Sequence, residues 1–255
     1  MHLKPLATGL SLLGSAAASH ELNASSLFSN SDTQISSIPS IYESTLQARR
    51  ILHLSNIATL STNFPSESST ENRPHEVAGA PIGLMEYFAN CGPEVYNPTV
   101  LGVTIATTMR NAAAGSNVTL SLRYHLPADA PPTDDSWAYL AANLPRFALV
   151  GYLEKLDEGV IEKNEIRNCF VATHPEAKIW EPGTDIHESW WGRLVVQQVY
   201  FFGGFGDRAR IAWLPIELWR NITTEEVEAY RMVGEKGYKH GQVSMEDAIK
   251  VQLDL

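Results

Sequence analysis

The chain has 255 residues, 44% of them hydrophobic, which is enough for one large domain or two small ones with a sizeable core. Its formal net charge is −10, from 19 basic and 29 acidic residues, and its longest basic run is the pair Arg49–Arg50. Because nucleic-acid binding depends on clustered positive charge, we expect no nucleic-acid partner.

The N-terminus has the three parts of a secretory signal peptide. Lys4 supplies a positive charge, residues 6–13 form a short apolar run, and residues 16–19 offer a small-residue cleavage site. The run is too short to span a membrane, and we expect no membrane-spanning helix elsewhere. We therefore predict a signal peptide over residues 1–19, in preference to a disordered tail, and a protein that is secreted (extracellular) or endolysosomal.

Secretion gives meaning to three acceptor patterns for N-glycosylation, at Asn23, Asn117 and Asn221. Asn23 lies in a Ser- and Asn-rich stretch, residues 20–40, that we interpret as a flexible linker. Asn221 follows a predicted strand, so both sites should be accessible. Asn117 opens a predicted strand and is sterically poorer. The pattern predicts a glycoprotein.

The first half of the chain predicts one helix and several strands. Ser44–Gln47 has the form of a capping box, so we expect a helix over Thr45–Ser55. Alternation of apolar residues and their β-branched types predict strands at Ile57–Ser61, Pro74–Phe88 (interrupted by Gly and Pro), Thr99–Thr107, Asn117–Tyr124 and Phe147–Leu156. Residues 108–116 are a connector, and residues 136–143 are a predicted short helix.

The second half predicts two more helices and a β-hairpin. Apolar residues at helical spacing, from Ile166 to Thr173, indicate a helix over Glu162–Thr173. Residues 194–214 contain a β-branched and aromatic run, a glycine-rich break and an alternating return strand, which together predict a hairpin. Thr223–Glu226 is a second capping box and opens a helix to Val233, with Gly234 as its C-cap. Residues 234–255 are a polar tail.

Most chemical motifs in the chain have a simpler explanation. Gly204–Ala209 matches the glycine pattern of a dinucleotide-binding turn, but a strand follows it where that motif needs a helix. His75–Glu76 and His187–Glu188 lack a second histidine at metalloprotease spacing, so we predict no metal site. Asp185, His187 and Glu188 are better explained as a solvated loop than as an acid–base group. Cys91 and Cys169 fit no zinc pattern, and either a disulfide or two free thiols is open.

The polar run Thr104–Asn111 is the most distinctive candidate site. It lies where a predicted strand ends and contains hydroxyls, an arginine and an asparagine. An arginine can hold a phosphate through two parallel hydrogen bonds. On the residues alone, a polar strand end with a solvated arginine is the favoured explanation.

Several runs together resemble a known family. They are Asn168–Phe170, His174–Trp180, Val199–Gly204, Ala48–Leu52 with Ala58–Thr62, and Asn111–Leu122. In order and spacing they are similar to the CREG glycoproteins, within the pyridoxamine phosphate oxidase-like, FMN-binding split-barrel superfamily. Phe202–Gly206 with Ile211 also resembles the hairpin of haem-utilisation split-barrel proteins.

About six strands, three short helices and a predominantly antiparallel order suggest an α+β barrel. The resemblance implies the same class over residues 41–233: a six-stranded antiparallel split β-barrel with flanking short helices. It also implies a homodimer whose cofactor pockets lie at the subunit interface, with Thr107, Thr108, Arg110 and Asn111 as the candidates to hold an FMN phosphate. True pyridoxamine phosphate oxidases have an adjacent basic pair where this chain has Arg110 alone.

CREG glycoproteins are regarded as having lost flavin binding. The resemblance therefore implies a binding or regulatory role without established catalysis, towards an unidentified protein or small molecule. Two alternatives stay open: an FMN-dependent oxidoreductase, and a haem-binding protein with His174 or His187 as axial ligand. The cofactor is accordingly FMN, haem or none.

Overall fold

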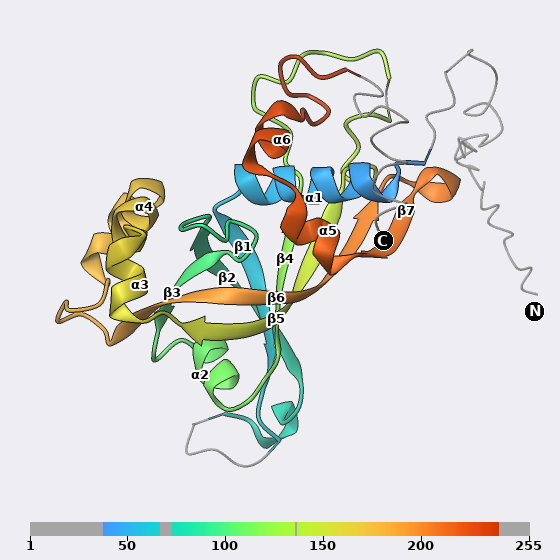
Figure 1. The fold of residues 1–255 in the computed structure, drawn as a ribbon. Coiled ribbons are helices and arrows are strands. Elements are labelled where there is room, and N and C mark those ends of the chain that lie inside the picture. The colour runs from blue at the N-terminus through green and yellow to red at the C-terminus, as the bar shows by residue number, and fades with distance from the viewer. Residues whose placement is uncertain (1–37, 67–72, 136, 240–255) are drawn as a thin grey trace, which may run out of the picture. The chain divides into compact units, whose positions relative to one another are not determined.

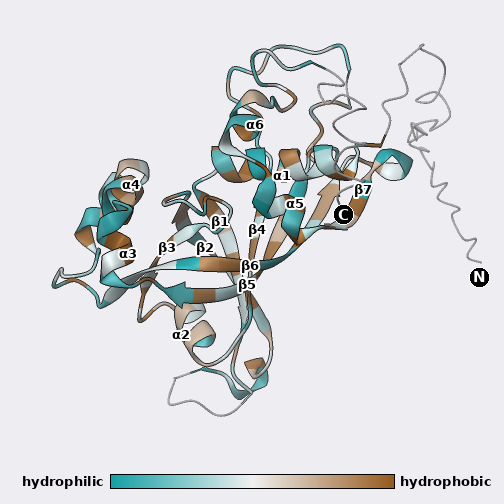
Figure 2. Ribbon diagram, in the orientation of Figure 1, coloured by the Kyte–Doolittle hydropathy of each residue, from teal (hydrophilic) through white to brown (hydrophobic). Residues whose placement is uncertain are grey.

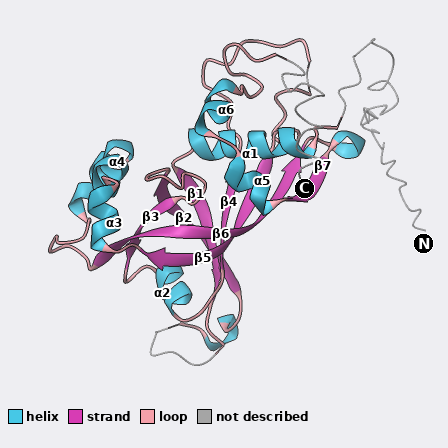
Figure 3. Ribbon diagram, viewed as in Figure 1, coloured by secondary structure: helices cyan, strands magenta, loops and turns pink. Residues whose placement is uncertain are grey.

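The structure is a computed structural model that describes residues 38–66, 73–135 and 137–239. The predicted signal peptide, the sequon at Asn23, nearly all of the predicted linker and the tail beyond residue 239 lie outside the described residues. Within the described part, strands form the centre and helices lie around them (Figures 1 and 3).

Across the described ranges, seven strands form one antiparallel sheet, and six of them close into a barrel. They are β1 (Ile57–Asn63), β2 (Pro81–Ala89), β3 (Thr99–Val103), β4 (Val118–Arg123), β5 (Arg146–Lys155), β6 (Ser189–Gly203) and β7 (Arg210–Leu214). Their order is β3-β2-β1-β4-β5-β6-β7, and an additional pairing of β3 with β6 closes the barrel. The predicted six-stranded antiparallel barrel is confirmed, and β7 is an extra strand outside the closed ring.

The long strand β6 makes this arrangement work. β5 pairs along one edge of β6, while the other edge pairs first with β3 and then with β7. The β6–β7 pairing confirms the predicted hairpin, whose turn contains Gly204 at φ +94°. Gly151 lies at the one register shift between β5 and β6, where a Cβ would meet the Val195 carbonyl oxygen at 2.0 Å. Glycine is therefore required at this bulge.

Alternation along the strands separates the core from the outer face, and Figure 2 shows hydrophobic and hydrophilic stretches following one another along them. Leu60, Leu120 and Leu149 are paired in register and are at most 1% exposed, inside the barrel. The neighbouring residues Ser121 and Ala148 point to the outer face. Burial of one face only fixes the register, because a slip of one residue would expose the core.

In the residues that the structure describes, six α-helices and three short 3₁₀ turns surround the sheet. The α-helices are α1 (Ile41–Leu54), α2 (Thr107–Ala113), α3 (Glu158–Lys163), α4 (Ile166–Thr173), α5 (Ile216–Asn221) and α6 (Thr224–Ala229). The 3₁₀ turns are η2 (His75–Val77), η3 (Pro175–Ile179) and η4 (Gly206–Arg208). In Figure 1, α1 lies beside α5 and α6, and α2 lies at the opposite side of the barrel.

The helix starts test the two predicted capping boxes. α1 begins at Ile41, because the Ser40 hydroxyl accepts the Glu43 N–H at 3.0 Å; Ser44 is fully buried inside the helix, so the first capping box is wrong. The second is confirmed, since Thr223 and Glu226 exchange both capping hydrogen bonds. α6 ends at Ala229, so Gly234 is not its C-cap.

Other element boundaries differ from the prediction. The helix expected over Glu162–Thr173 is two helices, α3 and α4, broken at Glu165, whose φ is 50°. The strand expected from Pro74 starts only at Pro81, after η2, and the strand from Thr99 ends at Val103. Residues 137–143 form turns where a helix was expected. α5 was not predicted.

The α3–α4 lobe has its own small core and is joined covalently to the barrel. Cys91 and Cys169 form a disulfide with a Cα–Cα distance of 5.8 Å, which answers the question that the sequence left open. Phe170 and Trp191 pack there with their ring centroids 5.2 Å apart. In the part of the chain that the structure describes, no helix is long and apolar enough to cross a membrane.

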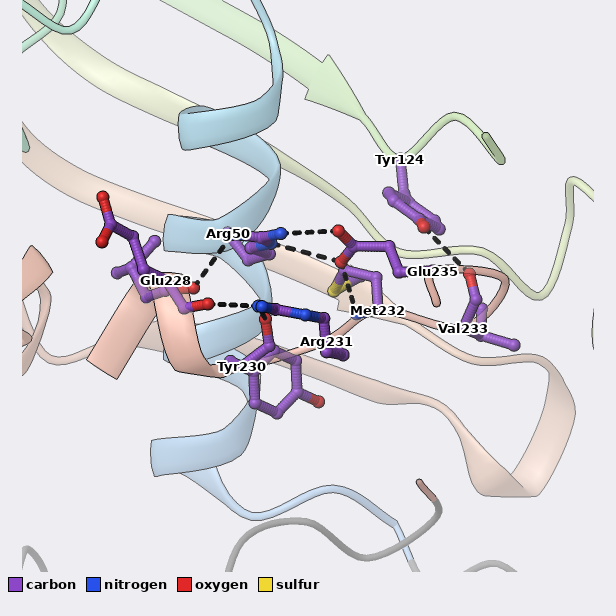
Figure 4. Close-up of polar contacts among 9 residues, drawn as sticks. Arg50, Tyr124, Glu228, Tyr230, Arg231, Met232, Val233 and Glu235 are labelled. Atoms are coloured by element: carbon purple, nitrogen blue, oxygen red, sulfur yellow. Dashed lines mark hydrogen bonds and ion pairs between the residues drawn. The ribbon is translucent and has the colours of Figure 1, made fainter. Parts of the chain in front are cut away.

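The segment after α6 folds back on α1 (Figure 4). Arg50 makes two hydrogen bonds to the Glu235 carboxylate, at 2.6 and 3.2 Å, and Glu235 also accepts the Met232 N–H at 2.7 Å. The Tyr124 hydroxyl donates to the Val233 carbonyl at 2.9 Å. Burial alone would raise the pKa of Glu235, but the bonds from Arg50 and Met232 outweigh it and hold the pKa below its usual value.

Candidate functional site

The four residues expected to hold a phosphate all lie on α2. Thr107 is half-buried and Arg110 is exposed, whereas Thr108 and Asn111 are at most 1% exposed. α2 packs on β1 and β2, and the buried Met109 belongs to the main core. The helix therefore covers one end of the barrel, with two of the four side chains turned inward.

The inward side chains already have partners. The Thr108 hydroxyl donates to the Glu86 carboxylate at 2.5 Å, and the Asn111 amide donates to the Thr62 hydroxyl at 3.1 Å. Burial raises the pKa of Glu86, although the hydrogen bond from Thr108 opposes the rise. Asn111 Oδ1 has no hydrogen-bond partner in the described structure.

This arrangement does not fit an FMN phosphate. The Thr108 hydroxyl and the Asn111 amide donate to Glu86 and Thr62 inside the barrel. The Glu86 carboxylate would also repel a phosphate placed beside Thr108. A phosphate on this helix would have only Thr107 and Arg110 at the surface. The assignment of these four residues to a cofactor stays a prediction, and we derive no chemistry from it.

A groove of about 550 Å³ lies on the outer face of the sheet. Its walls come from β1, β2, β4, β5 and β6: Ile57, Ala58, Thr59, Met85, Ser121, Leu122, Arg123, His125, Arg146, Phe147, Ala148, Tyr200 and Phe202. A mostly apolar groove of this size, with a few polar groups, is typical of small-molecule sites.

The strand register explains how one row of residues forms the groove floor. Paired positions cross the sheet from β2 to β6, in the order Met85, Thr59, Ser121, Ala148 and Tyr200. Beyond the groove, Trp213 on β7 is paired with Tyr200, and their ring centroids lie 5.0 Å apart with the planes tilted by 57°. The floor is thus polar and small-sided in its middle and aromatic at one side.

The groove has one basic end. Arg123 on β4 and Arg146 on β5 are direct cross-strand partners. The Arg123 Nε–H donates to His125 Nε2 at 3.3 Å, and the Arg146 guanidinium lies 3.9 Å from the centre of the Phe202 ring. This end lies near Ile57 at the start of β1, whereas α2 contacts Thr62 near the end of β1. The basic end and the α2 residues therefore occupy opposite ends of the same strands.

The groove was not predicted from the sequence, although the alternation of outward and buried residues that forms its face is present there. On β4, Ser121 and Arg123 alternate with buried leucines, and on β5 Arg146 and Ala148 alternate with Phe147 and Leu149. That alternation marks an outer face. The pairing that puts Arg123 opposite Arg146 depends on the register between strands, which periodicity within one strand does not contain.

The histidines considered as haem ligands do not line the groove. His174 is 2% exposed, its Nε2 lies 2.9 Å from the Phe88 carbonyl oxygen, and its ring packs on Phe170 and Tyr87. His187 is exposed in the loop before β6, beside the exposed Asp185 and Glu188. Within the described ranges, no group of three or more His, Cys, Asp or Glu residues could hold a metal ion.

Comparison with known proteins identifies the family. The model of the CREG β-barrel family matches residues 39–221. The chain belongs to this family. The match covers the strands from β1 to β7 and α1 to α5, so it includes the groove. No curated protein matches the chain.

Solved structures of similar fold include bacterial split-barrel proteins. A heme binding protein from Mycobacterium smegmatis is 19% identical with a TM-score of 0.50, over 69% of this chain and 60% of that protein. A protein of unknown function from Agrobacterium tumefaciens is 20% identical with a TM-score of 0.44, over 64% and 57%. A Clostridium acetobutylicum protein of the pyridoxinephosphate oxidase family, related to general stress protein 26, is 13% identical with a TM-score of 0.42, over 70% and 98%. The chain thus spans about 60% of the length of the first two proteins. At 19% identity, the likeness to the first supports a similar fold and nothing further.

Proposed function

We propose that this CREG-family barrel is a binding protein of the secretory route, without catalysis, that takes a small molecule in its outer-face groove. The groove carries the proposal, because its 550 Å³ and its mostly apolar walls suit a small ligand. The described residues that line it include no carboxylate and no cysteine, and its polar groups are hydroxyls, two arginines and a histidine. Such groups orient a ligand and bind charge.

Two observations support the secretory route. A disulfide between Cys91 and Cys169 is typical of oxidising compartments. Asn117 and Asn221 are both exposed, so oligosaccharide transfer meets no steric barrier from the folded barrel at either sequon. Expression in a secretory host tests this: we expect protein in the medium or in endolysosomes that loses mass on enzymatic deglycosylation. An unglycosylated cytosolic product would contradict it.

We further propose a homodimer in which the outer faces of two barrels meet. Large apolar side chains on this face are exposed on both sides of the groove: Ile57 at 47%, Met85 at 57%, Ile211 at 51% and Trp213 at 58%. Exposed apolar patches of this kind favour association. A dimer of this kind would bring two grooves to the interface.

One alternative is favoured by a specific observation. The flat aromatic wall of Tyr200 and Phe202 beside two arginines suits an isoalloxazine or a porphyrin as well as other flat molecules. FMN supports redox chemistry and haem supports oxygen or electron chemistry when bound. A visible spectrum of the purified protein, before and after addition of FMN and then haem, separates these cases. Stoichiometric uptake of either would replace the purely binding function by an oxidoreductase or a haem protein.

A further inference from the structure

We propose that Arg123 and Arg146 form an anion-binding site at the basic end of the groove, for the phosphate or carboxylate group of a flat aromatic ligand. The inference rests on the proposed small-molecule function of the groove. This site is separate from the α2 residues, which lie at the other end of β1 and β4.

The first observation is an unfavourable charge pair. Arg123 and Arg146 lie directly opposite each other on neighbouring antiparallel strands. Like charges in such pairs destabilise a sheet. Among the residues that the structure describes, neither guanidinium has a carboxylate partner. An anion between them removes the repulsion, because each guanidinium can donate parallel hydrogen bonds to it.

The second observation is the surroundings of the pair. Arg146 lies over the Phe202 ring and reaches the Ala142 carbonyl only at 3.5 Å, and Arg123 donates only to His125 at 3.3 Å. These are weak uses of charged donors. In a protein of net charge −10, two cations kept without carboxylates on a groove wall point to an anionic ligand.

The third observation selects the shape of the ligand. The floor next to the basic end is made of Ala148, Ser121 and Thr59, whose small side chains leave room, and Tyr200 and Phe202 stand at its side. A flat aromatic body can lie with one face on this floor and one edge against the aromatic rings. Its anionic group then lies at the end of the groove, between the arginines.

Two matched dyes test the anion site. 8-Anilinonaphthalene-1-sulfonate is a flat aromatic anion, and N-phenyl-1-naphthylamine is its neutral counterpart; both are titrated by fluorescence into the full-length secreted protein. The double variant Arg123→Gln/Arg146→Gln should weaken the anionic dye by about tenfold or more, and leave the neutral dye unchanged. Arg208→Gln, an exposed arginine in the hairpin turn, is the matched control.

The outcomes separate the two proposals. Ser121→Trp fills the groove floor and should abolish both dyes; if it changes neither, or if neither dye binds the unsubstituted protein, the small-molecule function of the groove itself fails. If Ser121→Trp removes both dyes but the double Arg variant keeps full affinity for the anion, only the anion site is wrong. Displacement of the anionic dye by FMN but not riboflavin identifies a phosphate, and displacement by 1-naphthoate identifies a carboxylate. Displacement by none of them contradicts the proposal.

Discussion

Glu86 is a half-buried residue whose protonation affects stability. Its carboxylate accepts from Thr108 inside the barrel end, and burial raises its pKa above the usual 4.5. The folded state therefore binds a proton more readily than the unfolded state. The resulting contribution to stability is present below pH 4.5 and is lost as pH rises through the folded-state pKa.

We predict that Glu86→Gln stabilises the protein at pH 7 and has a smaller effect at pH 4.5. Glutamine keeps an acceptor for Thr108 and carries no charge that burial would penalise. Urea unfolding at both pH values measures the difference. The exposed Glu76→Gln is the control and should change neither value. An equal gain at both pH values would show that charge is not the cause.

The side chains of α2 also show a limit of prediction at the residue scale. The sequence shows that four neighbouring polar residues lie together, and all four are on α2: Thr107, Thr108, Arg110 and Asn111. Their directions depend on whether the backbone is a strand or a helix: in a helix, positions 108 and 111 are three apart and share one face. The strand expected to Thr107 ends at Val103, and the helix turns this shared face into the barrel.

The disulfide is the main device that joins the α3–α4 lobe to the barrel. It closes 78 residues of sequence separation between Cys91 and Cys169. Closing a loop of this length in the unfolded chain is worth about 4 kcal/mol in the chain-entropy model. We predict that the double variant Cys91→Ala/Cys169→Ala loses about this much of the free energy of unfolding, as measured in guanidinium chloride under oxidising conditions.

A reductant should abolish the difference between the two proteins, because both then lack the cross-link. The small core of Phe170 and Trp191 remains in either case, so the lobe keeps its packing in the native state. If the unsubstituted protein shows two free thiols when unfolded without reductant, the disulfide does not form and the prediction fails.

An ion pair between Arg50 and Glu235 joins the segment after α6 to α1. Arg50 and Glu235 have side chains that are only 9% and 12% exposed. We predict that Glu235→Gln lowers the free energy of unfolding at pH 7 by about 3 kcal/mol, because it leaves a buried arginine without its counter-charge. Thermal and urea unfolding measure this loss.

Acid should remove the same stabilisation in the unsubstituted protein. The pKa of Glu235 is lowered in the fold, so its contribution is present above pH 4.5 and is lost as pH falls through the folded-state pKa. The two proteins should therefore converge in acid. Glu217→Gln breaks an exposed pair with Arg220 and is the matched control, with an expected effect of about 0.5 kcal/mol or less. A loss equal to that of the control would contradict the role of the pair.

Element prediction succeeded where local patterns decide and failed where packing decides. The β6–β7 hairpin and the capping box at Thr223 rest on local chemistry, and both are confirmed. α5 was missed because Pro215 was interpreted only as the end of a strand. Proline also begins helices, and here the fully buried Trp219 holds the helix to the barrel, where the Trp219 and Phe147 rings lie 6.0 Å apart.

At the scale of the whole molecule, closure of the barrel depends on contacts far apart in sequence. β3 pairs with β6 about ninety residues later, as in Val100 with Gly192. No periodicity within a strand contains that pairing. The number and antiparallel order of the predicted strands suggested a barrel, whereas its six-stranded split form was predicted through family resemblance. The groove follows from the same closure, since its walls come from five strands. The fold was therefore more predictable than the site.

The proposed dimer would cover the outer face of each barrel, which leaves large apolar side chains exposed in a single chain. Trp213 lies on β7, the extra strand outside the closed ring, and is 58% exposed. We predict that Trp213→Glu converts the dimer to monomer, because burying an unpaired carboxylate in an apolar interface is unfavourable. Sedimentation velocity measures the mass, which should be twice that of one chain for the unsubstituted protein.

Ile179→Glu is the matched control, since Ile179 is also 58% exposed but lies on η3 in the lobe. Dimerisation that survives in Trp213→Glu and is lost in Ile179→Glu would move the interface to the lobe. A monomer at every concentration of the unsubstituted protein would contradict the proposed dimer.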